Sequence, residues 1–269
     1  MTRIIKIPFV NGLGKTMGCK EAPEKIINEV ENIFTNEIGK KIGSSELGIS
    51  EISVDNSDID ESSEKIHSES LKYFSGNEKV IFLGGDHSIS YPVGKAFLEN
   101  CKNKSKNPCL IIFDAHPDLM PAVDKKAPTH EEWLRQLIEE EFPVENILLV
   151  GNRNSDIQEL EFIKDKKIQR INIDDIQEDV DNIADTIMEF AFGRELYLSL
   201  DIDVVDPVFA PGTGYKEVGG LTSREMIYLV KRINKMRNLK AVDIVEINPR
   251  KDNEGLTTRL GAKILAEFI

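Results

Sequence analysis

The residues best placed to do chemistry are three polar side chains, Asp114, His116 and Asp118, which follow the apolar run Leu110–Phe113. Such a run is typical of a strand buried on both faces of a parallel sheet. Alternate residues of an extended chain point to the same side, so the three side chains can converge beyond the strand. Two carboxylates and an imidazole at one point are costly without a positive charge between them. The segment therefore predicts a site for a divalent metal ion.

Side chains of the same kind stand at the ends of three other predicted strands: His87, then Asp201 and Asp203, then Glu246. The carboxyl ends of strands form the edge at which open α/β sheets bind ligands. Each motif alone could be a structural turn, and Asp-x-Asp is common by chance. Carboxylates gathered at one edge without partners would destabilise the fold, so their coincidence favours a functional site.

The inferred ligand set contains two imidazoles and four carboxylates: His87, Asp114, His116, Asp118, Asp201 and Asp203. This oxygen-rich set suits Mn²⁺ better than the thiolate-rich sets of structural zinc do, although similar sites also accept Co²⁺, Ni²⁺ or Fe²⁺. Six ligands are too many for one ion, whereas two bridged ions about 3.5–4 Å apart would use them all. The sequence therefore predicts a dinuclear metal centre.

Strands and helices must alternate to bring these residues together. Apolar runs predict eight strands: Arg3–Phe9, Ile49–Val54, Lys79–Leu83, Leu110–Phe113, Asn146–Val150, Ile168–Ile173, Glu195–Leu200 and Lys240–Ile247. The segments between and after them predict helices: Ala22–Ile38, Asp60–Phe74, one capped by Ser88 and reaching Cys101, Thr129–Phe142, Asp156–Ile163, Ile176–Phe192, one capped by Thr222 and reaching Lys235, and Leu260–Phe268. Alternation predicts right-handed crossovers and a parallel sheet covered on both faces, with a closed barrel as the alternative. Without a linker or composition break, residues 1–269 are expected to form one domain.

The composition limits the partners that we expect. A net charge of −13 argues against nucleic acid as the main partner. An acidic surface could attract a cationic substrate, although most of these charges are expected only to keep the protein in solution. No apolar run approaches the length of a membrane span, and the first ten residues do not form a signal peptide, so a cytoplasmic protein is expected. The cysteines, Cys19, Cys101 and Cys109, form no CxxC motif and are expected to be buried, inert thiols.

Five motifs together resemble those of the ureohydrolases, the family of arginase, agmatinase, formimidoylglutamase and guanidinobutyrase. They are GGDHS (84–88), DAHPD (114–118), SLDIDVVDP (199–207), the APGTG–GGL segment (210–221) and EINP (246–249), in the family's order and spacing. The resemblance covers essentially the whole chain. It implies a single-domain, three-layer α/β/α fold with an eight-stranded parallel sheet, and it favours the open sheet over the barrel.

The resemblance also implies a role for each site residue. One Mn²⁺ would bind His87, Asp114, Asp118 and Asp201, and the other Asp114, His116, Asp201 and Asp203, so Asp114 and Asp201 would bridge the two Mn²⁺ ions of each subunit. The substrate would be a small cationic guanidino or amidine compound, cleaved to urea and an amine. Asp118 would act as general acid and base, and Glu246 would pair with the guanidinium. His130 would shuttle protons, although it could instead be a polar residue in the first turn of a helix. The family suggests a homotrimer or homohexamer.

The chain departs from the family's motifs at positions that bear on the substrate. Met120 stands where arginases carry an asparagine for the α-carboxylate, Tyr215 replaces a threonine near the guanidinium, and Glu131 replaces a glycine after the shuttling histidine. In contrast, Asp156 and Glu159 match carboxylates that bind the α-amino group in arginases, although they could simply be helix-start acids. We therefore expect agmatine first, with arginine, guanidinobutyrate or formiminoglutamate as alternatives.

Three other classes of protein share parts of this pattern. A metallophosphoesterase would need GNH followed by an acid, but Arg153 follows Gly151-Asn152. A single-zinc deacetylase would not need Asp118, Asp203 and the GGDHS motif. A metal-binding regulatory protein without turnover is the alternative outside the enzymes, because Tyr215 and Glu131 could abolish catalysis. Two bound metals without any product would identify it.

Overall fold

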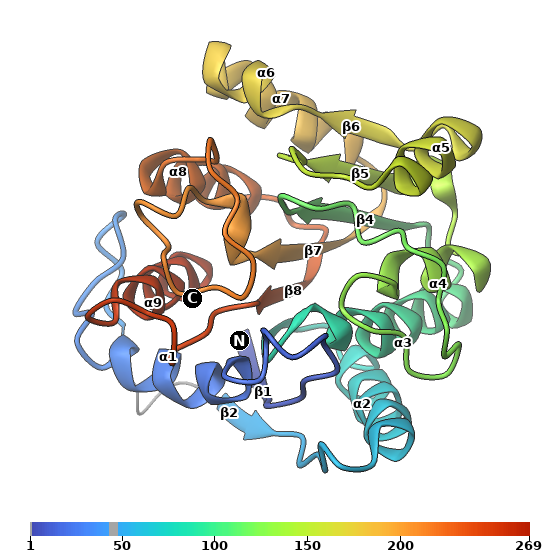
Figure 1. Cartoon of the computed structure of the whole chain (residues 1–269). Helices are drawn as coiled ribbons and strands as arrows, with labels where there is room; N and C mark the ends of the chain where they lie inside the picture. The colour runs from blue at the N-terminus through green and yellow to red at the C-terminus, as the bar shows by residue number, and fades with distance from the viewer. Residues whose placement is uncertain (1, 43–47) are drawn as a thin grey trace.

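The chain folds around one open, eight-stranded sheet in the order β2-β1-β3-β8-β7-β4-β5-β6, with every neighbouring pair parallel (Figure 1). This computed structural model describes residues 2–42 and 48–269. The strands are β1 (Thr2–Ile7), β2 (Gly48–Glu51), β3 (Lys79–Gly84), β4 (Pro108–Phe113), β5 (Ile147–Val150), β6 (Gln169–Ile171), β7 (Glu195–Asp201) and β8 (Leu239–Val245). The predicted parallel sheet is confirmed. Because β2 and β6 end the strand order and do not pair with each other, the closed barrel is excluded.

Helices cover both faces of the sheet and give three layers (Figure 1). One face packs against α1 (Ala22–Val30), α6 (Ile173–Glu178), α7 (Val180–Phe190), α8 (Ser223–Ile233) and α9 (Leu256–Phe268). The other packs against α2 (Ile59–Phe74), α3 (Ser90–Asn103), α4 (Trp133–Glu139) and α5 (Ile157–Lys166). Successive residues of a strand alternate between the two cores, as Leu110 and Ile111 of β4 do. In the described part of the chain, no helix is both long and apolar enough to cross a membrane.

The strand order places four strand ends side by side in the middle of the sheet. β3, β8, β7 and β4 are consecutive neighbours, although they are the third, eighth, seventh and fourth strands along the chain. The predicted site residues follow these four strands. The connection from β3 to β4 passes over the positions that β8 and β7 later fill. The topology thus gathers segments more than a hundred residues apart at one edge.

Several predicted helix boundaries are wrong. The helix predicted to reach Ile38 ends at Val30, and beyond it Asn36 holds a turn by accepting a hydrogen bond from the Lys40 amide. The helix predicted from Ile176 to Phe192 is two helices, the second capped by Asp179. Ser88 is no helix cap: it lies in the 3-10 turn His87–Ile89, which Asp86 caps.

The helix predicted from Thr129 begins four residues later, at Trp133. Only half of the expected capping box forms. The Glu132 carboxylate accepts a hydrogen bond from the Thr129 amide at 2.9 Å, but the Thr129 hydroxyl has no hydrogen-bond partner among the described residues. The segment from Thr129 to Glu132 is therefore a separate turn, and His130 lies in this turn. The box of Thr222 and Glu225, in contrast, forms in full and starts α8.

Candidate metal centre and active site

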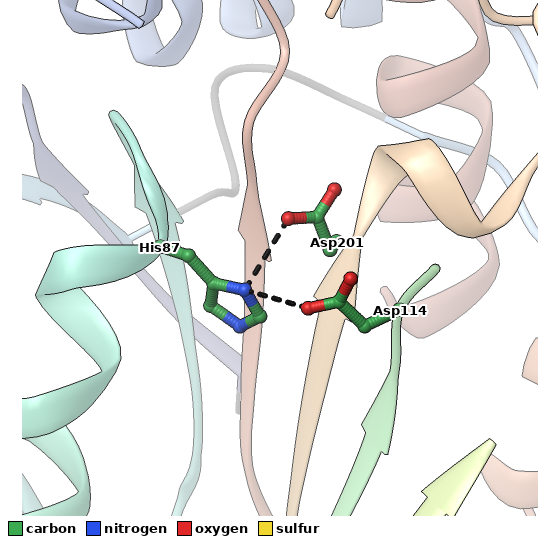
Figure 2. Close-up of side chains that lie close together, drawn as sticks. All are labelled: His87, Asp114 and Asp201. Atoms are coloured by element: carbon green, nitrogen blue, oxygen red, sulfur yellow. Dashed lines mark ion pairs between the residues drawn. The ribbon is translucent and has the colours of Figure 1, made fainter. Parts of the chain in front are cut away.

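Three carboxylates converge on one nitrogen of His87. Its Nδ1 atom lies 3.0 Å from Asp114 Oδ2, 2.9 Å from Asp118 Oδ2 and 3.2 Å from Asp201 Oδ2. Figure 2 shows the side chains of His87, Asp114 and Asp201 pointing toward one another from the ends of three different strands. All of these side chains are buried. These are the four residues that the family resemblance implies for one metal ion.

A second cluster forms around His116, on the other side of Asp114. His116 Nδ1 lies 3.0 Å from Asp203 Oδ2 and 3.5 Å from Asp114 Oδ1. Asp114 thus turns one oxygen toward each histidine, which is the arrangement that a bridging carboxylate needs. Asp201 Oδ2 also faces His87, and its Oδ1 atom accepts a hydrogen bond from the Asp203 amide at 2.8 Å, as Asp114 Oδ1 does from the His116 amide at 2.6 Å. The bridging role of Asp201 stays a prediction.

The donor set fits divalent cations. A single ring hydrogen on His87 cannot serve three carboxylates, and in the described chain both His87 Nδ1 and Asp114 Oδ2 lack a hydrogen-bond partner. Burial and neighbouring carboxylates raise the pKa of Asp114 to about 6 and that of Asp201 well above its usual range. Burial alone would lower the pKa of His87, but the surrounding carboxylates raise it. Each of these shifts shows that the site favours added positive charge. Oxygen and imidazole ligands of this kind suit Mn²⁺ and similar ions.

Backbone amides and buried polar groups hold these ligands in place. Asp203 Oδ1 accepts a hydrogen bond from the Ala115 amide at 3.0 Å, which ties the ends of β7 and β4 together. Behind His87, its Nε2 atom lies 2.9 Å from Ser199 Oγ, and that hydroxyl donates to Asp243 Oδ1 at 2.8 Å. Such outer partners fix the orientation of a ligating imidazole. The sequence analysis missed Ser199 and Asp243, although an acid inside the apolar run of β8 was a signal.

Glu246 and His130 form a buried pair beside the carboxylates. Glu246 adopts a left-handed backbone conformation, with φ of 63°, that is rare outside glycine. Its Oε1 atom accepts a hydrogen bond from the His87 amide at 2.9 Å and lies 3.4 Å from His130 Nδ1. Burial would lower the pKa of His130, but Glu246 and nearby acids raise it to about 9. Such strained, charge-coupled residues are common at functional sites.

The loop before α1 approaches this pair closely. The buried carboxylate of Asp86 accepts hydrogen bonds from the Asn11 amide and the Thr16 hydroxyl, both at 2.9 Å. A Cβ atom on Gly12 would clash with Thr16 Oγ1 and lie 3.1 Å from the His130 ring. Glycine is therefore needed where this loop passes His130. The sequence analysis assigned Asp86 no role, although it belongs to the GGDHS motif.

A cavity of about 270 Å³ opens beside the two clusters. The residues that line it are His116, Asp118, Met120, His130, Glu131, Asn154, Ser155, Asp156, Glu159, Asp201, Asp203, Tyr215, Glu217 and Glu246. Five of these are site residues that the sequence predicted in addition to Asp118, while His87 and Asp114 lie deeper. Tyr215 stands in the wall, its ring centre 5.3 Å from that of His130 and 6.2 Å from that of His116. The ammonium of Lys15 lies 4.3 Å from the Tyr215 ring centre. Tyr215 thus narrows the cavity between the two histidines.

The acids at the outer part of the cavity have different partners. Glu159 is buried and accepts hydrogen bonds from the Leu119 and Asp156 amides, both at 2.8 Å, so it completes the capping box of α5. Asp156 caps the same helix but remains exposed. Glu217 accepts a hydrogen bond from Asn154 Nδ2 at 2.9 Å and lies 3.4 Å from His116 Nε2. The helix-start interpretation thus holds for Asp156 and Glu159, and Glu217 is a cavity acid that the sequence analysis missed.

The cysteines are buried, as the sequence predicts. All three cysteines are free and buried, and burial raises the pKa of Cys101 and of Cys109 to about 12. Cys19 was not expected near the site, yet its Sγ atom lies 3.8 Å from Glu246 Oε2. His67 is on α2, away from the cavity, with Nε2 3.1 Å from Glu99.

The fold and these clusters define an α/β protein with candidate metal ligands on the carboxyl ends of its central strands. The model of the arginase family matches residues 2–269, and the chain belongs to this family. Its members are hydrolases that act on amidino C–N bonds of small guanidino compounds. The family normally binds a dinuclear metal centre, and the His87 and His116 clusters are suited to metal ions.

Relatives in the family bear different names. An arginase from Staphylococcus aureus is 30% identical over 221 residues, which are 76% of this chain and 72% of that protein. An agmatinase from Bacillus subtilis is 32% identical over 188 residues, 70% of this chain and 61% of that one. The solved structure of a proclavaminate amidinohydrolase from Streptomyces clavuligerus superposes with a TM-score of 0.86 and 27% identity, covering 99% of this chain and 89% of that chain. Similarity to three differently named enzymes establishes the family and not the substrate.

Proposed function

We propose that this protein is an agmatinase, which hydrolyses agmatine to urea and putrescine with two Mn²⁺ ions per subunit. The observation that carries the proposal is the charge of the cavity. In the described chain, the lining residues include acids at both depths, from Asp203 and Glu246 to Glu131 and Glu217, but neither lysine nor arginine. Agmatine is cationic at both ends, so each end would find a carboxylate.

Two cations, Arg153 and Lys15, contact residues of the cavity wall but do not line the cavity. The guanidinium of Arg153 donates hydrogen bonds to backbone carbonyls, among them those of Asp203 at 2.7 Å and Glu217 at 2.6 Å. Lys15 stands over the ring of Tyr215. Arginine, guanidinobutyrate and formiminoglutamate all carry a carboxylate, which would enter this acidic cavity without a charged partner. Burying an unpaired charge is costly, and agmatine avoids that cost.

Each proposed catalytic residue has a task that its position supports. Glu246, fixed by the His87 amide, would hold the guanidinium through two parallel hydrogen bonds. Two divalent cations held by His87, Asp114, His116, Asp118, Asp201 and Asp203 would lower the pKa of a shared water, so that hydroxide is available at neutral pH. Asp118 would take the proton left on the nucleophile. His130 would then protonate the departing amine as the C–N bond breaks.

Product release over a substrate panel tests this proposal. Protein loaded with Mn²⁺ would be assayed with agmatine, arginine, guanidinobutyrate, guanidinopropionate and guanidine for urea, and with formiminoglutamate for formamide. We expect kcat/KM for agmatine to exceed that for arginine by about tenfold or more, the effect of roughly 1.4 kcal/mol. A higher kcat/KM with another compound would overturn agmatine as the substrate. If no compound of the panel gives product although two metals are bound, a regulatory protein without turnover would be favoured. Parallel loading with Co²⁺, Ni²⁺ and Fe²⁺ tests the metal.

A further inference from the structure

Trp133, the only tryptophan of the chain, contacts two of the candidate ligands at once. Its side chain is fully buried, and its Nε1 atom donates a hydrogen bond to Asp118 Oδ2 at 2.8 Å. Its ring lies against His87, with ring centres 4.8 Å apart and planes tilted by 39°. Both contacts reach the cluster around His87, and the structure gives Trp133 none with His116.

The contact with Asp118 involves the oxygen that faces His87. Asp118 Oδ2 lies 2.9 Å from His87 Nδ1, so this one oxygen points both to the indole N–H and to the place where the ligands converge. A carboxylate that holds a donor on a fixed oxygen cannot rotate freely.

The neighbouring backbone holds both partners rigidly. Asp118 has φ of 54°, a left-handed conformation, and the amide of the next residue, Leu119, is bound by Glu159 at 2.8 Å. On the other side, the Glu132 carboxylate ties the turn before Trp133 to the Thr129 and Val123 amides. The hydrogen bond between Trp133 and Asp118 therefore joins two segments that are each fixed independently. The backbone of Asp118 is strained, so its carboxylate needs such support to keep one orientation.

We propose that Trp133 is a positioning residue for the metal ion on the His87 side of the centre. Its indole N–H sets the orientation of Asp118, and its ring restricts the rotation of His87. The inference rests on the metal centre of the proposed function but not on agmatine as the substrate. Outer partners of metal ligands typically change metal affinity or activity by about 10–100-fold when they are removed.

The test compares metal binding by wild type and Trp133→Phe, without any substrate. Phenylalanine keeps an aromatic ring beside His87 but has no N–H. We expect both proteins to bind two Mn²⁺ ions at saturation, measured by equilibrium dialysis. In Trp133→Phe, one of the two should bind about 10–100-fold more weakly while the other keeps its affinity. Equal affinities for both ions in the two proteins would overturn the proposal.

A matched control separates positioning from loss of packing. Phe74 is a buried aromatic residue on α2 that packs against Phe82 and Phe97, away from the site. Phe74→Leu should lower the melting temperature by an amount similar to Trp133→Phe, yet bind both ions normally. If Phe74→Leu weakened one ion as much as Trp133→Phe does, the effect would be general destabilisation and the proposal would fail.

Fluorescence gives a second, independent measurement. Because Trp133 is the only indole, the tryptophan emission of wild type comes from a ring in contact with His87 and Asp118. Titration with Mn²⁺ and with diamagnetic Mg²⁺ should change that emission in step with the ion whose affinity depends on Trp133. Unchanged emission with both metals, while dialysis shows binding, would contradict the contact. A protein that binds metal in this way but is silent on the substrate panel would refute the proposed function alone.

Discussion

His130 Nδ1 lies 3.4 Å from Glu246 Oε1, and both side chains are more than nine-tenths buried. Burial opposes a charge on His130, but Glu246 and nearby acids raise its pKa to about 9. Its other nitrogen, Nε2, has no hydrogen-bond partner in the described part of the chain. At neutral pH the pair therefore holds a proton beside the cavity, which is what a general acid for a departing amine requires.

Replacing His130 by asparagine should slow turnover without removing metal. We expect kcat to fall by about 10²-fold or more, the usual contribution of a general acid. Metal content should stay at the wild-type level, because His130 contacts Glu246 and not the metal ligands. The control is His67→Asn on α2, which should keep full activity. If His130→Asn kept full activity, His130 would not be the proton shuttle.

The same pair predicts how stability depends on pH. The pKa of His130 is raised from 6.5 to about 9 in the folded protein, so the protonated imidazole stabilises the fold. This contribution is complete below about pH 6.5 and is lost as the pH rises through about 9. Melting temperatures of metal-free wild type and His130→Asn should therefore differ most at pH 6 and converge by about pH 10. A gap that stayed constant or widened with pH would contradict the assignment.

Replacing Asp203 should remove one of the two metal ions and leave the other bound. Its Oδ2 atom faces His116, while its Oδ1 atom is held by the Ala115 amide. Asp203→Asn keeps the shape but removes the charge, so binding at the His116 cluster should fail together with activity. We expect about one Mn²⁺ per chain in elemental analysis, with turnover reduced by at least about 10²-fold. Two ions bound at wild-type affinity would show that Asp203 is no ligand.

Replacing Arg153 should lower the stability of the fold, even when lysine takes its place. Its guanidinium donates to the carbonyls of Gly151, Asp203, Val204, Glu217 and Val218, and so joins the end of β7 to the loop that carries Tyr215 and Glu217. Lysine has neither the reach nor the planar set of donors. Arg153→Lys should cost roughly 1–3 kcal/mol of unfolding free energy and raise KM. Arg259→Lys, at an exposed position, is the control. An unchanged denaturation midpoint would contradict this role of Arg153.

The sequence predicted the parts of this molecule that depend on local pattern. An apolar run such as Leu110–Phe113 has few ways to bury its side chains other than as a strand inside the sheet. All eight predicted strands therefore lie within a few residues of the observed ones. The side chains after β4 converge as expected, because alternation in an extended chain fixes their direction. A predicted helix was wrong where a single side chain caps a new one, as Asp179 does at the start of α7. Such a bond depends on the tertiary position of the turn, which hydrophobic periodicity does not contain.

The sequence alone predicts neither the order of the strands nor the residues that hold the metal ligands in place. Nothing in the chain order indicates that β8 lies beside β3, so the contact of Glu246 with His87 and His130 needed the structure or the family resemblance. Trp133 lies in the predicted helix, as the first residue of α4, but its hydrogen bond with Asp118 depends on tertiary packing. The contacts of Ser199 with His87 and with Asp243 join β7 to the turn after β3 and to β8, so the sequence does not predict them.

Gly12 gives a last prediction, because the loop that it belongs to reaches the site without contributing a ligand. A Cβ atom there would clash with Thr16 Oγ1, lie 2.8 Å from Asp86 Oδ2 and crowd the His130 ring. Gly12→Ala must therefore displace the loop or the side chains of Thr16, Asp86 and His130 that crowd it. Since displacements near 1 Å can cost about 10²-fold in rate, we expect a large fall in kcat with metal content retained.

The control for this substitution is Gly48→Ala, where a Cβ atom would meet no atom of residues 2–42 and 48–269 within 4 Å. It should leave both activity and melting temperature nearly unchanged. The double variant Gly12→Ala/His130→Asn should be little slower than His130→Asn alone, because both changes would act through the same imidazole. If the two effects multiplied instead, the loop would influence catalysis by a route other than His130.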